Sequence, residues 1–318
     1  MKGGAVKSAP PACIYACFVI LFRYTKGVII MKLRRITALI LCVIMLIGSM
    51  SIAAFAEEEK QFYLVLGDSI GYGSGLRNSK DACYGKIVAD TNGYDYANDA
   101  IPGHTTQNLL SRLENESVCE HVKQADIISI SIGGNNFLLG NLPALLYNLI
   151  VKDDLSQAES IIDGFCKDFG KIIETIRSLN PDAVILMQTL YNPQTGYIGE
   201  AYQVSIDMLN DAIRRYQSEK GEIEIVDVAA KLTDSGKDFA SDGIHPSVEG
   251  NKKIAVAVLE KLVELGLGET AEPVIKTEGV DANVPSAFAA PLNLFGEILH
   301  ILSVIRGWFS FINDILPF

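Results

Sequence analysis

The segment FYLVLGDSIGYGSG, residues 62–75, decides how the fold of this chain is interpreted. Its first five residues are aromatic or aliphatic, which is typical of a buried strand. Gly67-Asp68-Ser69 ends that run, and three more glycines follow within six residues. A strand that breaks into a glycine-rich turn at a serine raises the question of whether Ser69 is a nucleophile.

Downstream of this segment, short β-branched runs alternate with longer helical patterns. Strands are expected at 62–66, 94–97, 126–132, 183–188 and 223–228. Helices are expected near 84–91, 105–113, 155–179, 199–219 and 247–265. This alternation predicts an α/β domain over residues 57–268, with a parallel sheet covered by helices on both faces.

The N-terminal 56 residues have the features of a leader. They hold seven of the 27 basic residues and none of the 38 acidic ones. From Met31, basic residues precede an apolar run that ends in the small-x-small motif Ala54-Phe55-Ala56, so residues 31–56 are interpreted as a secretory signal peptide. A membrane-spanning anchor is the alternative. Residues 1–30 precede a complete signal, and we interpret them as a mis-annotated upstream extension.

Cleavage after Ala56 would leave a formal net charge of −18, because the leader removes seven basic residues and no acidic ones. A chain this acidic is not expected to bind nucleic acid or anionic lipid through charge. Cys83, Cys119 and Cys166 would remain, with no CxxC spacing, so a zinc site is not indicated. Either one disulfide or none is compatible with three cysteines, and the sequence does not choose the pair.

Residues 67–71 match the G-x-S-x-G nucleophile elbow. An α/β-hydrolase is excluded, because that fold places its nucleophile after several strands and Ser69 follows the first strand. A dinucleotide fingerprint would need glycine at position 76, where Leu76 stands, and the Gly-Lys-Ser/Thr of a phosphate-binding loop is absent. Ser69 as a nucleophile with partners farther along the chain remains.

A serine nucleophile needs a nearby base, and the base needs an orienting group. Of the four histidines, His245 fits best, because Asp242 stands three residues before it on a turn ahead of the last expected helix. The carboxyl ends of parallel strands meet at one edge of the sheet, where ligands bind. Ser69 and His245 can therefore meet there, although 176 positions separate them.

Two more loops at this edge offer donors for an oxyanion hole. Gly103 follows the second expected strand, and Asn135 follows the third. Together with the backbone N–H of Ser69 they would make three donors. Five further residues are candidates either for the lining of the substrate cleft or for the core: Tyr72, Tyr84, Phe137, Leu138 and Leu139.

Four blocks occur in a fixed order: Gly67-Asp68-Ser69-Ile70, Gly103, Gly133-x-Asn135 and Asp242-x-x-His245. They resemble the SGNH hydrolases, the GDSL-type esterase and lipase family, over roughly residues 62–266. The resemblance implies a flavodoxin-like three-layer α/β/α sandwich with a five-stranded parallel sheet. It also implies a Ser69–His245–Asp242 triad, an oxyanion hole and neither metal nor cofactor. Asn136 stands where the family usually has aspartate, which puts the rigidity of that loop in question.

Beyond the domain, residues 269–291 are interpreted as a linker and residues 292–318 as an amphipathic, largely apolar helix. That tail can lie in a membrane interface, pack on a partner or a second copy, or fold back onto the domain. Interfacial anchoring or self-association is the favoured interpretation.

The sequence thus predicts a secreted serine esterase or lipase, attached to the cell surface or membrane if the tail anchors it. Its substrate would be a small ester, a lipid ester or an acylated glycan. A non-catalytic glycan-binding module on the same scaffold and an acyltransferase are the alternatives.

Overall fold

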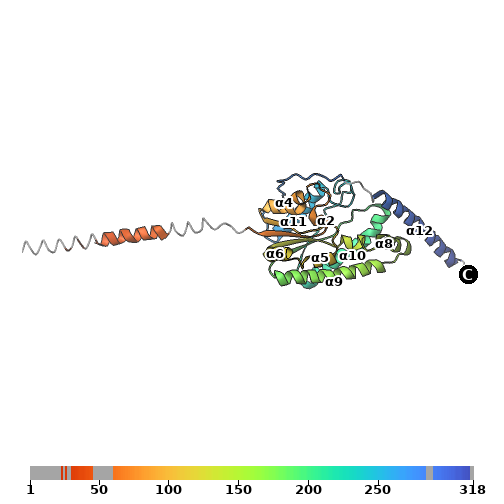
Figure 1. Cartoon of the computed structure of the whole chain (residues 1–318), viewed down its shortest axis with the longest axis horizontal. Helices are drawn as coiled ribbons and strands as arrows, with labels where there is room; N and C mark the ends of the chain where they lie inside the picture. Colours follow the sequence, from red (N-terminus) through yellow and green to blue (C-terminus); the bar gives the residue numbers. More distant parts are fainter. Residues whose placement is uncertain (1–22, 24–25, 27–29, 46–59, 284–288, 316–318) are drawn as a thin grey trace, which may run out of the picture. The chain divides into compact units, whose positions relative to one another are not determined.

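The computed structural model of the protein describes residues 23, 26, 30–45, 60–283 and 289–315. The chain forms two compact units, Met1–Glu59 and Lys60–Phe318 (Figure 1). In the first unit a helix covers residues 30–45, within the predicted leader, whereas the motif at 54–56 lies outside the described residues. None of the described helices combines the length and apolar character that crossing a bilayer requires.

The second unit is built on a sheet of five parallel strands in the order β2-β1-β3-β4-β5. The strands are β1 (Phe62–Gly67), β2 (Asp95–Asn98), β3 (Ile127–Ser131), β4 (Val184–Gln188) and β5 (Glu224–Val226). This is the flavodoxin-like order, in which all carboxyl ends share one edge. The predicted fold class and all five predicted strands are confirmed, although β5 is shorter than expected.

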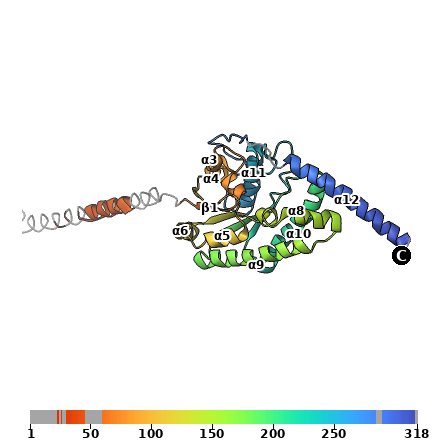
Figure 2. The ribbon, with the colours of Figure 1, turned by 45° about the vertical axis from the view of Figure 1, so that its right-hand side comes forward.

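Helices cover both faces of the sheet (Figure 2). One face carries α4 (Tyr84–Asn92) and α11 (Val248–Glu264). The other carries α5 (Thr106–Arg112), α6 (Glu116–Gln124), α9 (Ser156–Leu179) and α10 (Gly196–Lys220). Successive side chains of a strand point to opposite faces of the sheet. Leu64 and Leu66 of β1 therefore pack under α5, α6, α9 and α10, whereas Tyr63 and Val65 pack under α4 and α11.

Short elements surround the carboxyl edge of the sheet, and the sequence did not predict them. They are α2 (Ser69–Tyr72), α3 (Ser79–Ala82), α7 (Gly134–Leu138), α8 (Leu142–Tyr147) and the π-helical η1 (Asn148–Lys152). Each has four to six residues, which is less than two helical turns and too little for a helical period to show in the sequence.

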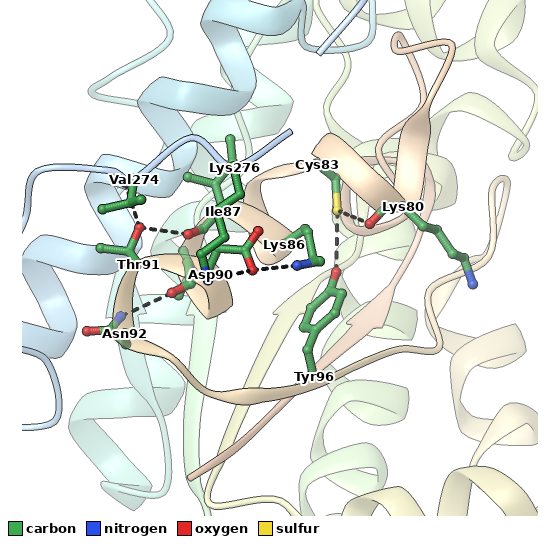
Figure 3. Close-up of polar contacts among 11 residues, drawn as sticks. Lys80, Cys83, Lys86, Ile87, Asp90, Thr91, Asn92, Tyr96, Val274 and Lys276 are labelled. Carbon is green, nitrogen blue, oxygen red and sulfur yellow. Dashed lines mark hydrogen bonds and ion pairs between the residues drawn. The ribbon is translucent and has the colours of Figure 1, made fainter. Parts of the chain in front are cut away.

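The segment interpreted as a linker follows the surface of the domain through residue 283. The backbone N–H of Ala282 donates to the carbonyl of Gly75 at 2.7 Å. The N–H of Val274 donates to the hydroxyl of Thr91, a residue of α4, at 2.9 Å (Figure 3). The described part of the segment is therefore held against α4 and the loop that follows α2. Helix α12 (Ala289–Ile315) comes after it.

Candidate active site

Ser69 is the first residue of α2, where the chain turns out of β1. Asp68 caps this helix: its Oδ1 accepts the N–H of Ile70 at 3.0 Å and the hydroxyl of Ser131 at 2.8 Å. Burial raises the pKa of Asp68 to about 6, although these two hydrogen bonds oppose the shift. Asp68 therefore fixes the serine turn against the carboxyl end of β3.

His245 and Asp242 lie in the loop that precedes α11. The Nδ1 of His245 lies 2.7 Å from the Oδ2 of Asp242, and the other carboxylate oxygen accepts the backbone N–H groups of Ile244 and His245 at 2.9 and 3.0 Å. Burial works to raise the pKa of Asp242, but these hydrogen bonds outweigh it and lower the pKa to about 2. The carboxylate is thus ionised at neutral pH and orients the imidazole through Nδ1.

Two close contacts hold the histidine loop at the carboxyl edge. Gly75, just beyond α2, has φ +100°, and a Cβ there would lie 2.5 Å from the carbonyl oxygen of Pro246 and 3.0 Å from the Cβ of His245. On the other side, the hydroxyl of Tyr191 donates to the carbonyl of Ile244 at 2.9 Å. The serine turn and the histidine loop are therefore packed together, although they are far apart in the sequence.

Two of the three expected oxyanion donors lie on neighbouring segments, Gly103 on the loop before α5 and Asn135 in α7. Asn135 lines the pocket beside Ser69, and its Nδ2 donates to the carbonyl of His104 at 2.9 Å. Gly103 is exposed, with φ +81°, and is not among the residues that line the pocket. An amide NH₂ has two hydrogens, so one remains for an oxyanion.

Asn136 departs from the usual family residue and yet makes two hydrogen bonds. Its Oδ1 accepts the N–H of Thr106 at 3.2 Å, and its Nδ2 donates to the hydroxyl of Thr106 at 2.8 Å. Thr106 begins α5, which follows the Gly103 loop. The amide thus ties α7 to the start of α5.

A pocket of about 830 Å³, including its open mouth, lies beside Ser69 and Asn135. Most of its wall is apolar and comes from α7, α8, α10 and the loop after β4: Leu138, Leu142, Leu190, Ile198, Tyr202 and Ile206. Of the five residues proposed as lining or core, only Leu138 lines this pocket. Tyr84 and Phe137 are fully buried in the core, whereas Leu139 is 67% exposed.

Sequence reasoning missed several residues of the site. Tyr191 supports the histidine loop, and Ser131 supports Asp68. Each stands at or just beyond the carboxyl end of a strand, and that position was the available signal. Ile198 and Tyr202 of α10 gave no such signal, because only the packing of α10 against the sheet turns them toward the pocket.

The other histidines have different surroundings. His121 pairs with Asp99 at 2.7 Å. His300 stacks on Tyr197 with ring centroids 3.7 Å apart. Burial, and then the charge of Arg112, lower the pKa of His104. His245 is therefore the described histidine with a carboxylate partner beside the serine turn.

Within the part of the chain that the structure describes, no group of three or more His, Cys, Asp or Glu side chains is placed to hold a metal ion. The cysteines at 83, 119 and 166 are free thiols, and Cys83 is buried.

The model of the GDSL-like lipase/acylhydrolase family matches residues 65–253. The chain belongs to this family. A Bacillus subtilis (strain 168) protein described as "Uncharacterized protein YpmR" is 27% identical over 259 residues, which covers 74% of this chain and 99% of that protein.

Solved structures resemble this member of the GDSL-like family in fold. The lipase Lip_vut3 from a goat rumen metagenome has a TM-score of 0.55 at 22% identity, covering 66% of this chain and 99% of that one. Phospholipase A1 from Streptomyces albidoflavus NA297 has a TM-score of 0.51 at 17% identity, covering 64% and 99%. At these identities the likeness establishes the three-layer fold.

Proposed function

We propose that the protein is a secreted serine esterase or lipase that cleaves carboxylic esters through an acyl-enzyme. Membership of the GDSL-like family supports ester hydrolysis in general. The observation that carries the serine mechanism is the 2.7 Å hydrogen bond between His245 and Asp242, in a loop packed against the turn of Ser69.

In the proposed reaction the Oγ of Ser69 attacks the ester carbonyl while the Nε2 of His245 takes its proton. The tetrahedral oxyanion would accept hydrogen bonds from the N–H groups of Ser69 and Gly103 and from the free amide hydrogen of Asn135. His245 then returns the proton to the leaving alcohol, which leaves the acyl group on Ser69. Water, deprotonated by His245, attacks this acyl-enzyme and releases the acid.

The ionised Asp242 acts through His245. It holds the ring with Nδ1 toward the carboxylate and stabilises the imidazolium that forms in each step. Its pKa of about 2 keeps it charged at neutral pH. The proposed mechanism uses neither a metal nor a cofactor.

The apolar wall of the pocket favours the acyl chain as the part of the substrate that is bound there. Small esters, lipid esters and acylated glycans all present an acyl group, so the pocket alone does not select among them. Secretion is supported by the composition of residues 31–56, and an N-terminus near residue 57 in protein recovered from the culture medium would test it.

The function is tested with residues 57–318, which contain the compact second unit. Hydrolysis of p-nitrophenyl acetate, butyrate and palmitate is compared among the wild type, Ser69→Ala and Ser111→Ala. Ser111 is exposed on α5 and serves as the matched control. We expect Ser69→Ala to lose at least 10³-fold in kcat and Ser111→Ala to keep full activity.

Equal activity in Ser69→Ala and Ser111→Ala would refute the nucleophile. A folded wild type that is inactive on all three esters would instead favour the glycan-binding module or the acyltransferase.

A further inference from the structure

Helix α12 lies outside the residues matched by the family model, and one of its faces packs on the domain. Figure 2 shows it starting next to α8. Leu299 is 2% exposed and packs with Leu146, Val151 and Ile198. Gly296 lies so close to Ile198 that a Cβ would come within 2.7 Å of its Cγ1. This contact joins α12 to α8, η1 and α10.

Two polar residues of α12, His300 and Arg306, also contact the domain. His300 stacks on Tyr197 of α10, and the guanidinium of Arg306 donates to the carbonyl of Val151 in η1. Because 100° separates successive helical residues, Gly296, Leu299, His300 and Arg306 occupy one side of the helix.

The opposite side carries five large apolar residues that are 45–66% exposed: Leu294, Ile298, Ile301, Ile305 and Trp308. Their spacing of three or four residues places them in one line along about 21 Å of the helix. We call them the outer stripe. Glu297 borders it and is also exposed. A helix at a protein–water boundary normally turns its polar side outward, and α12 turns its apolar side outward instead.

The docked side of α12 lies directly behind the wall of the substrate pocket. Ile198 packs with Leu299 on one side and lines the pocket on the other, and Leu142 also belongs to both groups. Leu138 lines the same pocket, and its neighbour Leu139 is 67% exposed. The contact that docks α12 and the wall of the pocket therefore share Ile198 and Leu142.

We propose that the outer stripe of α12 binds the surface of a zwitterionic membrane or lipid aggregate, and that the esters cleaved are those of lipids at that surface. The proposal rests on the proposed ester hydrolysis and names its substrate class. By inserting the stripe among acyl chains, α12 would hold the acyl pocket at the place where such esters are concentrated.

Area and charge favour lipid over a second copy of the chain. A strip about 21 Å long and about 10 Å wide offers roughly 200 Å², well short of the roughly 800 Å² that each partner contributes to a stable interface. A lipid surface needs no matching partner surface. Arg306 is engaged by Val151, and residues 57–318 carry a net charge of −18, so a zwitterionic surface suits the protein better than an anionic one.

Trp308 makes the proposal directly testable, because it is the single tryptophan of the chain and is 66% exposed. Residues 57–318 carrying Ser69→Ala are titrated with phosphatidylcholine vesicles, so that binding is measured without hydrolysis. We expect the emission of Trp308 to shift to shorter wavelength and to be quenched by phosphatidylcholine brominated in its acyl chains.

No emission change at saturating lipid would overturn the proposal. A shift that follows protein concentration in the absence of lipid, and that lipid does not alter, would also overturn it, because that result assigns the stripe to a second copy.

A triple variant of the outer stripe, Leu294→Gln, Ile301→Gln and Ile305→Gln, provides the second arm. Its matched control replaces three half-exposed valines elsewhere on the domain: Val204→Gln, Val263→Gln and Val274→Gln. Vesicle co-sedimentation and hydrolysis of phosphatidylcholine vesicles should fall at least tenfold in the stripe variant and stay unchanged in the control. Equal loss, or no loss, in the two variants would overturn the proposal.

Hydrolysis of p-nitrophenyl acetate separates the two proposals. The stripe residues do not line the pocket, so the stripe variant should cleave this water-soluble ester as the wild type does. A wild type that binds vesicles but cleaves no ester would contradict the proposed function alone.

Discussion

The substitution Gly75→Ala tests whether the contact between the serine turn and the histidine loop sets the geometry of the site. Gly75 has φ +100°, a region in which a residue with a Cβ costs about 1–3 kcal/mol. The new Cβ would also lie 2.5 Å from the carbonyl oxygen of Pro246, so that peptide must move. Since Pro246 directly follows His245, the imidazole is expected to move as well.

A displacement of about 1 Å in a catalytic group can lower a rate about 10²-fold. We therefore expect Gly75→Ala to lose about 10²-fold in kcat on p-nitrophenyl acetate and about 1–3 kcal/mol in the free energy of unfolding by urea. Gly93→Ala is the matched control: Gly93 ends α4 with φ +71°, and nothing lies within 4 Å of its added Cβ. It should lose about 1 kcal/mol of stability and no activity.

The two variants share backbone strain and differ in the contact with the histidine loop. If folded Gly75→Ala keeps a kcat within about twofold of Gly93→Ala, the contact does not position His245 and the reasoning is refuted.

Three further substitutions test the hydrogen bonds around the site. Asp242→Asn should lower kcat by 10³-fold or more, because the amide cannot hold His245 in the required tautomer. In the wild type the carboxylate, with a pKa of about 2, stabilises the folded state above about pH 4, and this contribution is lost as the pH falls through 2. Asp68 has a raised pKa of about 6, so the wild type should lose at most about 3 kcal/mol of stability as the pH rises from about 4 through 6. In Asp68→Asn this loss should be absent when urea unfolding is compared at pH 4.5 and pH 7.5. Asn136→Asp should change the free energy of unfolding by urea by less than about 0.5 kcal/mol, because the two carboxylate oxygens can accept the N–H and the hydroxyl of Thr106. Asn136→Ala removes both hydrogen bonds and should lose about 1–3 kcal/mol.

The strands could be predicted because their signal is local. In Val184–Gln188, for example, the first four residues are an apolar run that the sheet buries on both faces. The site loops could be predicted for a topological reason, since parallel strands bring Ser69 and His245 to one edge. Neither argument depends on how individual side chains pack.

The pocket wall could not be predicted, because tertiary packing decides it. Tyr84 was a candidate lining residue, but its ring is fully buried in the core and its hydroxyl lies 3.3 Å from that of Ser129. Ile198 carried no motif and became part of the wall through the packing of α10 against the sheet. The same limit applies to Tyr191, which supports the site through a hydrogen bond to the carbonyl of Ile244, 53 positions later in the sequence.

The C-terminal helix shows why a helical period alone does not say which face meets water. The period of α12 separates a narrow polar side from a wide apolar side, and both sides are possible contact surfaces. Gly296 and Leu299 decide between them, because the small residue allows the backbone to approach Ile198 and the leucine fills the space beside it. Once that side is docked, His300 and Arg306 find partners on the domain, and the apolar side is left facing outward. The polar side therefore serves the fold, and the apolar side remains available for a lipid surface.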